Sequence, residues 1–267
     1  MTPMVRPGSA AGPQPEGPAG PQPEGPAGAE EGQRALLAPY RYGTDPLPGP
    51  PPGEGTRVWL VDVAAHAKEA AAQSHVLDDG ERERAAAFLR AADRDRYQVA
   101  HVALRRLLGG YLGRDPAALE FLREPCPGCG KQHGRPALPG APLHFSLSHS
   151  GDLVAIAVAD TPVGIDVEEL PAPHVVTEVA SVLHEDEQAE IAAQPGALRP
   201  AVFARCWTRK EAYLKGTGIG LAEDLAATLV GAGPEPVDPP GWALADLPLP
   251  AELRAYAAAC AVRRAAG

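Results

Sequence analysis

Proline and glycine dominate the first fifty residues, and this composition limits where the chain can fold. Residues 13–20 are repeated without change as residues 21–28, and both residue types stay frequent through Pro52. Because such a segment has few apolar side chains to bury, we expect residues 1–55 to form a disordered, solvated tail. The 267-residue chain should therefore fold from about Thr56 onwards.

The composition also argues against several classes of protein. The opening segment has no basic leader followed by an apolar stretch, and no other segment is long and apolar enough to span a bilayer. Four cysteines are too few for a disulfide scaffold in a chain of this length. A formal net charge of -10 argues against a general nucleic-acid binder. We therefore expect a cytoplasmic protein that binds neither nucleic acid nor membrane.

Hydrophobic periodicity after the tail predicts both strands and helices. Strands are expected at residues 56–63, 143–147, 153–159, 163–168, 225–230, 242–244 and 256–262. Helices are expected at residues 79–90, 95–112, 181–193 and 200–215, the last of them capped by a left-handed Gly216. Because strands and helices are mixed without strict alternation, the sequence predicts an α+β fold.

A short acidic segment at residues 164–168 is the first of two that indicate chemistry. Asp166 and Glu168 alternate with Ile165 and Val167. On a strand, both carboxylates would therefore project from one face, roughly 6.5 to 7 Å apart along the chain. One cation could lie between them. The alternative is that both are ordinary polar residues at a sheet edge.

The second segment, residues 206–215, has a helical pattern. Trp207, Glu211 and Lys215 recur every four residues, which places them on successive turns of one helix face. The helix thus adds a third carboxylate and a cation. Taken alone, Glu211 and Lys215 are also compatible with an ordinary ion pair between neighbouring turns.

Together the two segments predict a magnesium site. Asp166, Glu168 and Glu211 offer only oxygen ligands, which suit a hard cation such as Mg²⁺ better than zinc. Magnesium held in this way commonly completes its shell with phosphate oxygens of the substrate. Lys210 and Lys215 would then neutralise further phosphate charge.

Other polar groups suit an anionic ligand. Ser148, His149 and Ser150 are expected at the tip of a hairpin, where their hydroxyl and imidazole groups could contact a phosphate. A nucleophile triad is the weaker interpretation, because it needs a serine on a strained turn with separately supported partners. Arginines are also frequent between Glu81 and Arg106, although a solvated helix face would show the same pattern.

Cys126 and Cys129, followed by His133, resemble half of a zinc knuckle. Structural zinc usually has four protein ligands, and neither Cys206 nor Cys260 lies in a paired motif that would complete the set. A turn-rich loop is therefore the default interpretation, and metal binding by these residues stays open.

Four segments together resemble motifs of the Sfp-type 4'-phosphopantetheinyl transferases, which move phosphopantetheine from coenzyme A to a serine of a carrier protein. The matching segments are Gly-Arg-Pro at 134–136, Phe-Ser-Leu-Ser-His-Ser-Gly at 145–151, Gly-Ile-Asp-Val-Glu at 164–168 and Trp-Thr-Arg-Lys-Glu-Ala-Tyr-Leu-Lys at 207–215. Several short motifs in the right order are more specific than any one alone. The resemblance extends from about Leu77 to Leu221.

The resemblance implies a role for individual residues. Asp166, Glu168 and Glu211 would hold Mg²⁺ on the pyrophosphate of coenzyme A. Glu211 would be catalytic as ligand or base, and Lys215 would steady the reacting phosphate. The residues implied to contact coenzyme A are Arg105 and Arg135 beside the nucleotide, Ser148 and His149 at the phosphates, and Asp166, Lys210 and Lys215.

The resemblance also implies a fold and partners. The family fold consists of two similar α/β halves that form a pseudodimer within one chain, with the active site in the cleft between them. Here the halves would be residues 56–160 and 161–267, the second carrying the metal site. The partners would be coenzyme A and an acyl, polyketide or peptidyl carrier protein, and the enzyme would be a monomer.

Two other functions agree with part of the sequence. A metal-dependent nuclease also gathers Asp, Glu and Lys around magnesium, but the acidic chain argues against it. A carrier-binding protein that has lost the chemistry would keep the fold. The intact set of metal ligands argues against this second alternative.

Overall fold

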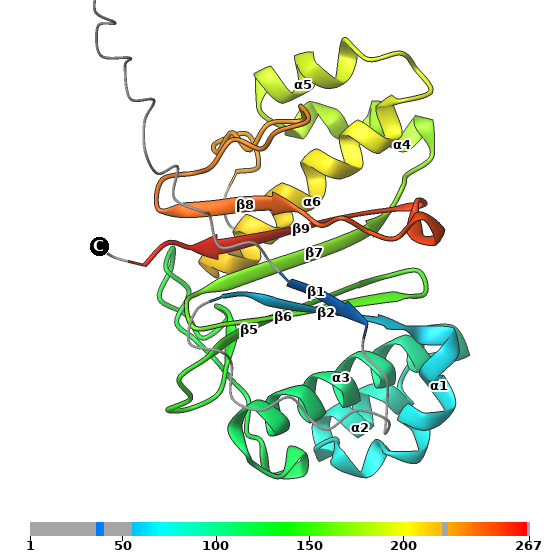
Figure 1. Cartoon of the computed structure of the whole chain (residues 1–267), viewed down its shortest axis with the longest axis vertical. Coiled ribbons are helices and arrows are strands. Elements are labelled where there is room, and N and C mark those ends of the chain that lie inside the picture. The colour runs from blue at the N-terminus through cyan, green and yellow to red at the C-terminus, as the bar shows by residue number, and fades with distance from the viewer. Residues whose placement is uncertain (1–35, 40–54, 221–223, 266–267) are drawn as a thin grey trace, which may run out of the picture. The chain divides into compact units, whose positions relative to one another are not determined.

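The computed structural model describes residues 36–39, 55–220 and 224–265, and for residues 36–39 it gives the backbone alone. Two sheets pack face to face at the centre of the described chain, and helices cover the outer face of each sheet (Figure 1). Most strand pairs are antiparallel and the helices are grouped on the outside. This arrangement confirms the predicted α+β class.

The first sheet has four strands in the order β1-β2-β6-β5. These strands are β1 (Leu36–Pro39), β2 (Arg57–Asp62), β5 (His144–Ser150) and β6 (Leu153–Ala159). β1 pairs in parallel with β2, and the other neighbouring strands are antiparallel. The outer face of this sheet packs against helices, through a core that contains Val61, Val154 and Ile156.

The helices on the first sheet are α1 (Val63–Ala72), α2 (Asp79–Ala86) and α3 (Ala91–Leu112). α2 begins with a capping box, in which Asp78 and Glu81 each accept a hydrogen bond from the other's backbone N–H. α3 ends at Gly113, whose φ of 61° is left-handed. The single-turn helices η1 (Ser74–Val76) and η2 (Pro116–Ala118) flank this helical layer.

The second sheet has three antiparallel strands in the order β7-β9-β8. Its strands are β7 (Val163–Glu169), β8 (Trp242–Asp246) and β9 (Tyr256–Arg263). The helices on its outer face are α4 (Pro173–Val179), α5 (Glu185–Ala192) and α6 (Arg199–Thr217), with the single turn η3 (Ala180–Val182). The single turn η5 (Ala251–Leu253) precedes β9, and its Leu253 packs against the core between the sheets. A separate two-stranded ribbon pairs β3 (Leu122–Arg123) with β4 (Pro136–Ala137).

The two sheets share an apolar core. Val58 and Ala157 from the first sheet meet Ile165, Val167 and Cys260 from the second in one buried cluster. This packing fixes β7 beside β5 and β6, so a polar residue on the flank of β7 can reach side chains of the other sheet. The predicted division between residues 160 and 161 falls in the turn that joins β6 to β7, and it stays a prediction.

One strand lies inside the segment predicted to be a tail. β1 is formed by Leu36 to Pro39, in the least polar stretch of that segment, and it pairs with β2. The prediction of a disordered segment from 1 to 55 is therefore wrong at these four residues, because a short apolar stretch can add to an open sheet edge. Apart from Gly55, the remainder of the predicted tail lies outside the described residues.

Three other predicted elements differ from the structure. The helix expected at 181–193 is interrupted, because His184 caps a new helix with Glu187 in a second capping box. No strand forms at 225–230; the backbone N–H of Val230 instead donates to Glu187 at 2.8 Å. Gly216 is not a left-handed cap, since α6 continues through Thr217 and Gly218 takes that role with a φ of 78°.

Candidate active site

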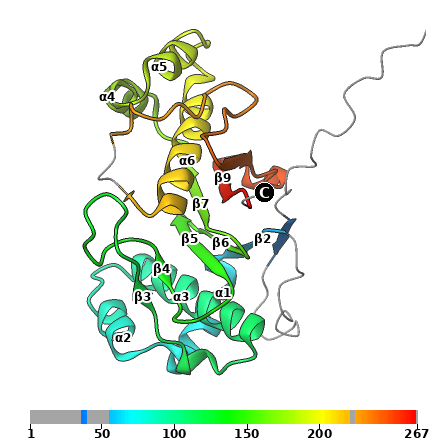
Figure 2. The same ribbon diagram turned by 90° about the vertical axis from the view of Figure 1, so that its left-hand side faces the viewer.

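Two of the three predicted metal ligands lie side by side on β7. Asp166 is 1 % exposed, and its Oδ1 accepts a hydrogen bond from Ser148 Oγ at 2.8 Å. Glu168 Oε2 accepts a hydrogen bond from Ser150 Oγ at 2.8 Å. Both serines belong to β5, so the two carboxylates lie where the sheets meet. The second view shows β5 and β7 next to each other, with α6 above them (Figure 2).

α6 supplies the third carboxylate because it approaches β7 unusually closely. A Cβ at Gly164 would lie 1.9 Å from the backbone oxygen of Ala212 and 2.4 Å from the nitrogen of Gly216. Only a residue without a side chain fits there. The close approach brings Glu211 near enough to Asp166 and Glu168 for their charges to interact.

Lys215 is the link between the helix and both sheets. Its Nζ lies 2.6 Å from Asp166 Oδ1 and 2.9 Å from Ser148 Oγ. The side chain is 32 % exposed, so it can reach a ligand from this position. As predicted from the helical spacing, Lys215 and Glu211 both belong to the group of residues around Asp166.

Burial disfavours the charged form of each of the three carboxylates. Burial raises the pKa of Asp166, although the charge and hydrogen bond of Lys215 oppose the shift. Burial, followed by the charges of Asp166 and Glu168, raises the pKa of Glu211. The pKa of Glu168 is also raised, first by burial. When ionised, the three acids carry three negative charges, and Lys215 supplies one positive charge beside them. An additional cation would therefore favour their charged forms.

The donor set fits a divalent cation. Asp166 Oδ2 is buried and makes no hydrogen bond, which leaves one carboxylate oxygen free to act as a ligand. The carboxylate oxygens favour magnesium or calcium over softer metals. The ligand oxygens of the three carboxylates do not all lie within 4.8 Å of one another. Within the described chain, the ligand atoms of Cys126, Cys129 and His133 do. A cation at the carboxylates would have to bring them closer together, and it could bind the free Oδ2 of Asp166 while Lys215 stays on Oδ1.

A cavity of about 560 Å³ opens beside Lys215. This volume is typical of small-molecule sites, which span roughly 300–1,000 Å³. Its charged and aromatic lining consists of Asp78, Glu81, His101, Phe121, Arg123, His133, Arg135, Phe145 and Lys215. A second cavity, of about 570 Å³ beside α4 and α5, has Arg199 as the single charged residue in its described lining, so the cavity beside Lys215 is the better candidate.

Arg135 lies in the lining of this cavity, and its contact with a ligand stays a prediction. Its guanidinium donates twice to Glu124 Oε2, at 3.0 and 2.7 Å, and once to the carbonyl oxygen of Gly216 at 3.0 Å. The last contact joins the loop before β4 to the end of α6. Arg135 therefore connects the cavity lining to the end of α6.

Ser148 and His149 are on β5, not at a hairpin tip. The strand continues to Ser150, and the turn consists of Gly151 and Asp152. The earlier boundary was wrong because Ser148 pairs with Ala155 in the sheet despite its polar side chain. Strand alternation places Ser148 towards Asp166 and leaves His149 exposed on the other side.

His149 has cationic neighbours that sequence reasoning did not connect to it. Although the His149 side chain is partly exposed, partial desolvation of its ring, followed by the charges of Arg96, His101 and Lys215, lowers its pKa. Arg96 also donates to the carbonyl oxygen of Gly151 at 2.6 Å, which fixes the turn after β5. Arg96 belongs to the arginine-rich stretch of the sequence. Its hydrogen-bond partner Gly151 is 55 residues away, so no local pattern connects the two.

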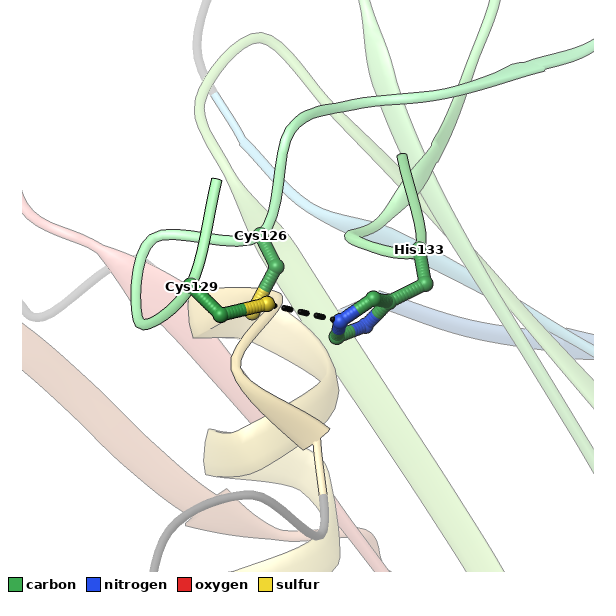
Figure 3. A group of neighbouring side chains, drawn as sticks. All are labelled: Cys126, Cys129 and His133. Carbon is green, nitrogen blue, oxygen red and sulfur yellow. Dashed lines mark hydrogen bonds between the residues drawn. The ribbon is translucent and has the colours of Figure 1, made fainter. Parts of the chain in front are cut away.

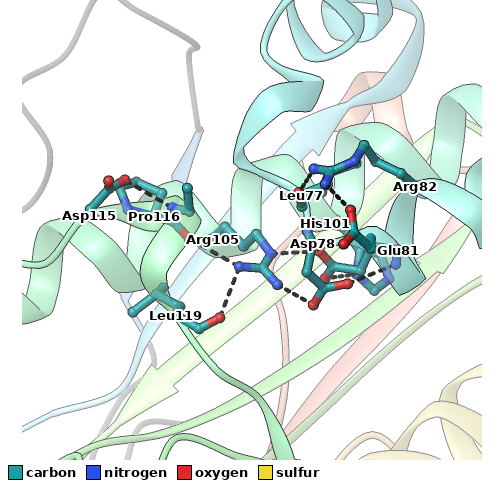
Figure 4. A network of polar contacts seen from close by, with 11 residues as sticks. Leu77, Asp78, Glu81, Arg82, His101, Arg105, Asp115, Pro116 and Leu119 are labelled. Atoms are coloured by element: carbon teal, nitrogen blue, oxygen red, sulfur yellow. Dashed lines mark hydrogen bonds and ion pairs between the residues drawn. The ribbon is translucent and has the colours of Figure 1, made fainter.

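Arg105 does not face the cavity and does not fit the predicted role beside a nucleotide. It is fully buried, and Figure 4 shows it between two acids and two backbone carbonyls. Its guanidinium bonds Asp78 and Glu81 at 2.6 Å each, and it also donates to the carbonyl oxygens of Pro116 and Leu119. Arg105 therefore fixes two acids of the cavity wall.

Lys210 also lies away from the candidate site. It is 3 % exposed, forms an ion pair of 2.8 Å with the buried Glu187 and donates to the carbonyl oxygen of Thr228. The physical reason is the helical period, because five residues rotate Lys210 by about 140° from Lys215. The prediction that Lys210 contacts coenzyme A is therefore not retained.

Comparison with known proteins identifies the family. Residues 162–256 match the model of the 4'-phosphopantetheinyl transferase superfamily. The 4'-phosphopantetheinyl transferase HetI of Nostoc sp. strain PCC 7120 is 30 % identical over 214 residues, which cover 75 % of this chain and 87 % of the relative. The chain belongs to the 4'-phosphopantetheinyl transferase family.

Two further relatives of this transferase match over shorter segments. Psf-1 of Bacillus pumilus is 40 % identical over 97 residues, or 36 % of this chain and 41 % of the relative. Sfp of Bacillus subtilis strain 168 is 27 % identical over 143 residues, or 53 % of this chain and 60 % of the relative. Both are named as 4'-phosphopantetheinyl transferases, in agreement with the resemblance found in the motifs.

None of the helices in residues 55–220 and 224–265 combines the length and apolar character needed to cross a membrane. The longest, α3, carries several charged residues.

Proposed function

We propose that this transferase moves the 4'-phosphopantetheine group of coenzyme A to a serine of an apo carrier protein, releases adenosine 3',5'-bisphosphate and depends on Mg²⁺. The observation that carries this proposal is the position of Lys215. The same side chain lines the 560 Å³ cavity and bonds Asp166, so the space for a ligand adjoins the acidic group. A pyrophosphate at this boundary would reach both.

The metal would be held by Asp166, Glu168 and Glu211. The free buried oxygen of Asp166 and the raised pKa values of the three acids, caused first by burial, support this assignment. When bound, the ion supplies neutralisation of pyrophosphate charge. With a ligand present, Lys215 would exchange its bond with Asp166 for one with the transferred phosphate.

Glu211 is proposed as the residue that accepts the proton of the carrier serine. In the metal-free protein its pKa is raised by burial and by the other two acids. A bound cation would oppose this shift, so we assign the proton to Glu211 as a loosely coordinated ligand that acts directly or through a bound water. The serine oxygen attacks the phosphorus on the pantetheine side. The bond to the bridging oxygen breaks, and the adenosine bisphosphate leaves with that oxygen. Beyond this proton transfer, the enzyme would contribute by positioning the reactants and neutralising the phosphate charge.

Two further groups suit the other end of coenzyme A. Arg135 borders it, and His149 has Arg96 as a cationic neighbour, so we propose these groups for the nucleotide phosphates. Ser148 contributes through Asp166 and Lys215, as a positioning residue. A carrier protein as acceptor rests on family membership, and the cytoplasmic location and monomeric state stay predictions from the sequence.

The mass of a purified apo carrier protein tests the proposal. The transferase, coenzyme A and Mg²⁺ should together add one phosphopantetheine to the carrier, and omission of any of the three should leave the apo mass. The nuclease alternative predicts cleavage of duplex DNA with Mg²⁺ and no need for coenzyme A. The inactive carrier-binding alternative predicts a complex in which the carrier keeps its apo mass.

A further inference from the structure

A second cluster of metal-ligating side chains lies outside the carboxylate site. Cys126, Cys129 and His133 each offer one ligand atom, and these three atoms all lie within 4.8 Å of one another. The closest pair is Cys129 Sγ and His133 Nε2, at 2.9 Å. Figure 3 shows the two thiols and the imidazole ring turned towards one point from opposite sides of the loop.

The spacing is close to that of a tetrahedral zinc site. Zinc–sulfur and zinc–nitrogen bonds of about 2.3 and 2.0–2.1 Å place tetrahedral ligand atoms roughly 3.5–3.8 Å apart. Cys129 and His133 need to separate by well under 1 Å from their present hydrogen bond to receive such an ion. Both are exposed and lie in an irregular loop, so little packing opposes this small movement.

The backbone already forms the tight turn that a zinc knuckle requires. The carbonyl oxygen of Cys126 accepts a hydrogen bond from Gly130 N–H at 2.8 Å, and the N–H of Cys126 donates to the carbonyl oxygen of Lys131 at 2.7 Å. Gly130 has a left-handed φ of 72°, which a residue with a side chain rarely adopts.

The ligand chemistry selects the metal. Two thiolates and an imidazole are soft or borderline donors, which favour zinc and do not suit magnesium. The other two cysteines, Cys206 and Cys260, are buried in the core around the second sheet. Three protein ligands leave a fourth tetrahedral position for water or an anion.

We propose that Cys126, Cys129 and His133 bind one Zn²⁺ ion, with water in the fourth position, and that the ion closes the loop that carries Arg135. His133 lines the cavity and is followed by Gly134, whose N–H donates to the carbonyl oxygen of Glu124 at 2.8 Å. An ion held at both ends of residues 126–133 fixes the chain two residues before Arg135. This inference does not depend on the proposed transfer reaction.

The first test is the zinc content of the full-length protein. Protein is produced in zinc-supplemented medium and separated from weakly bound metal by gel filtration. Inductively coupled plasma mass spectrometry should then find about one zinc ion per chain. Cys129→Ser and His133→Gln should each reduce the zinc content at least about tenfold. Mutation of a residue that only supports a metal ligand typically lowers metal affinity by 10–100-fold, and loss of the ligand itself should cost at least as much. His75→Gln, at an exposed histidine outside the loop, is the matched control and should keep the zinc.

Cobalt substitution supplies a readout that needs no variant. Zinc-free protein kept under reducing conditions should take up one Co²⁺ and show the strong visible bands of tetrahedral cobalt together with a thiolate charge-transfer band. Hydrogen exchange of residues 124–136 should slow on zinc addition, whereas that of α1 should not change. Folded, zinc-free protein without cobalt bands would overturn the proposal, as would a disulfide between Cys126 and Cys129 in protein prepared under reducing conditions.

Discussion

The ammonium of Lys215 lies 2.6 Å from Asp166 Oδ1 and 2.9 Å from Ser148 Oγ, so one side chain connects α6, β7 and β5. It stabilises a buried acid in the metal-free protein, and it also lines the cavity where a substrate phosphate would enter. A divalent cation on Asp166 would take over the first role and release Lys215 for the second. The stability of the metal-free protein and catalysis therefore depend on the same contact.

Lys215→Ala should destabilise the metal-free protein. The substitution leaves the buried carboxylate of Asp166 without its cation, which costs about 1–3 kcal/mol of unfolding free energy when the partial exposure of Lys215 is taken into account. Urea unfolding at neutral pH with a chelator measures the change, and Lys68→Ala, at an exposed lysine of α1, is the control. Equal stability of the two variants would show that Lys215 does not neutralise Asp166.

Gly164→Ala should disrupt the site through the backbone. The added methyl group would lie 1.9 Å from the oxygen of Ala212, so α6 must move away from β7. We expect a loss of about 1–3 kcal/mol of stability and a large loss of transfer, because Glu211 and Lys215 move with the helix. At Gly196 nothing lies within 4 Å of an added Cβ, and Gly196→Ala should stay within about 0.5 kcal/mol of the wild type. Thermal melts and transfer rates of both variants check this.

Glu211→Gln should stabilise the metal-free protein, increasingly so at higher pH. Because the pKa of Glu211 is raised in the folded protein, the folded state binds more protons than the unfolded state once the pH exceeds about 4. Its ionisation therefore lowers the unfolding free energy as the pH rises through that window. The neutral amide removes this cost.

Melting temperatures of the wild type and of Glu211→Gln, measured with a chelator from pH 4 to 8, test this. Their difference should grow with pH and shrink when Mg²⁺ is added, while Glu178→Gln, at an exposed glutamate of α4, should show neither trend. If Glu211→Gln keeps stabilisation by Mg²⁺ but loses transfer, the proposed role as base is supported. Loss of both would make Glu211 a ligand instead.

Arg105→Ala should reduce stability rather than selectively weaken coenzyme A binding. Arg105 is fully buried between Asp78 and Glu81, and removal of one partner of a buried ion pair costs about 3–5 kcal/mol. Arg114→Ala, at an exposed arginine after α3, is the matched control. Unchanged stability of Arg105→Ala together with a raised KM for coenzyme A would restore the role that the sequence resemblance implied.

The parts of the site that the sequence predicted correctly depend on local periodicity. Alternation along β7 places Asp166 and Glu168 on one face, and the helical period places Glu211 and Lys215 on one face of α6. Both patterns lie within a few residues. The end of α3 at Gly113 was predictable for the same reason, because a left-handed glycine is a local signal.

The parts that were missed depend on contacts between distant residues. The burial of Arg105 depends on acids more than twenty positions earlier and on carbonyl groups of η2, and no local pattern distinguishes it from an exposed arginine. Lys210 likewise pairs with Glu187 across two helices. The polar character of Ser148 suggested a turn, whereas its hydrogen bond to Asp166 satisfies the hydroxyl inside the sheet structure.

The mass of a carrier protein treated with wild-type enzyme and with Asp166→Ala tests the central claim most directly. With coenzyme A and Mg²⁺, the wild type should add one phosphopantetheine to each carrier, and a chelator should prevent it. Asp166→Ala, verified as folded by its thermal melt, should be slower by about 100-fold or more, as for the loss of a central electrostatic group. A carrier modified at the wild-type rate by Asp166→Ala, or one that the wild type never modifies, would contradict the account.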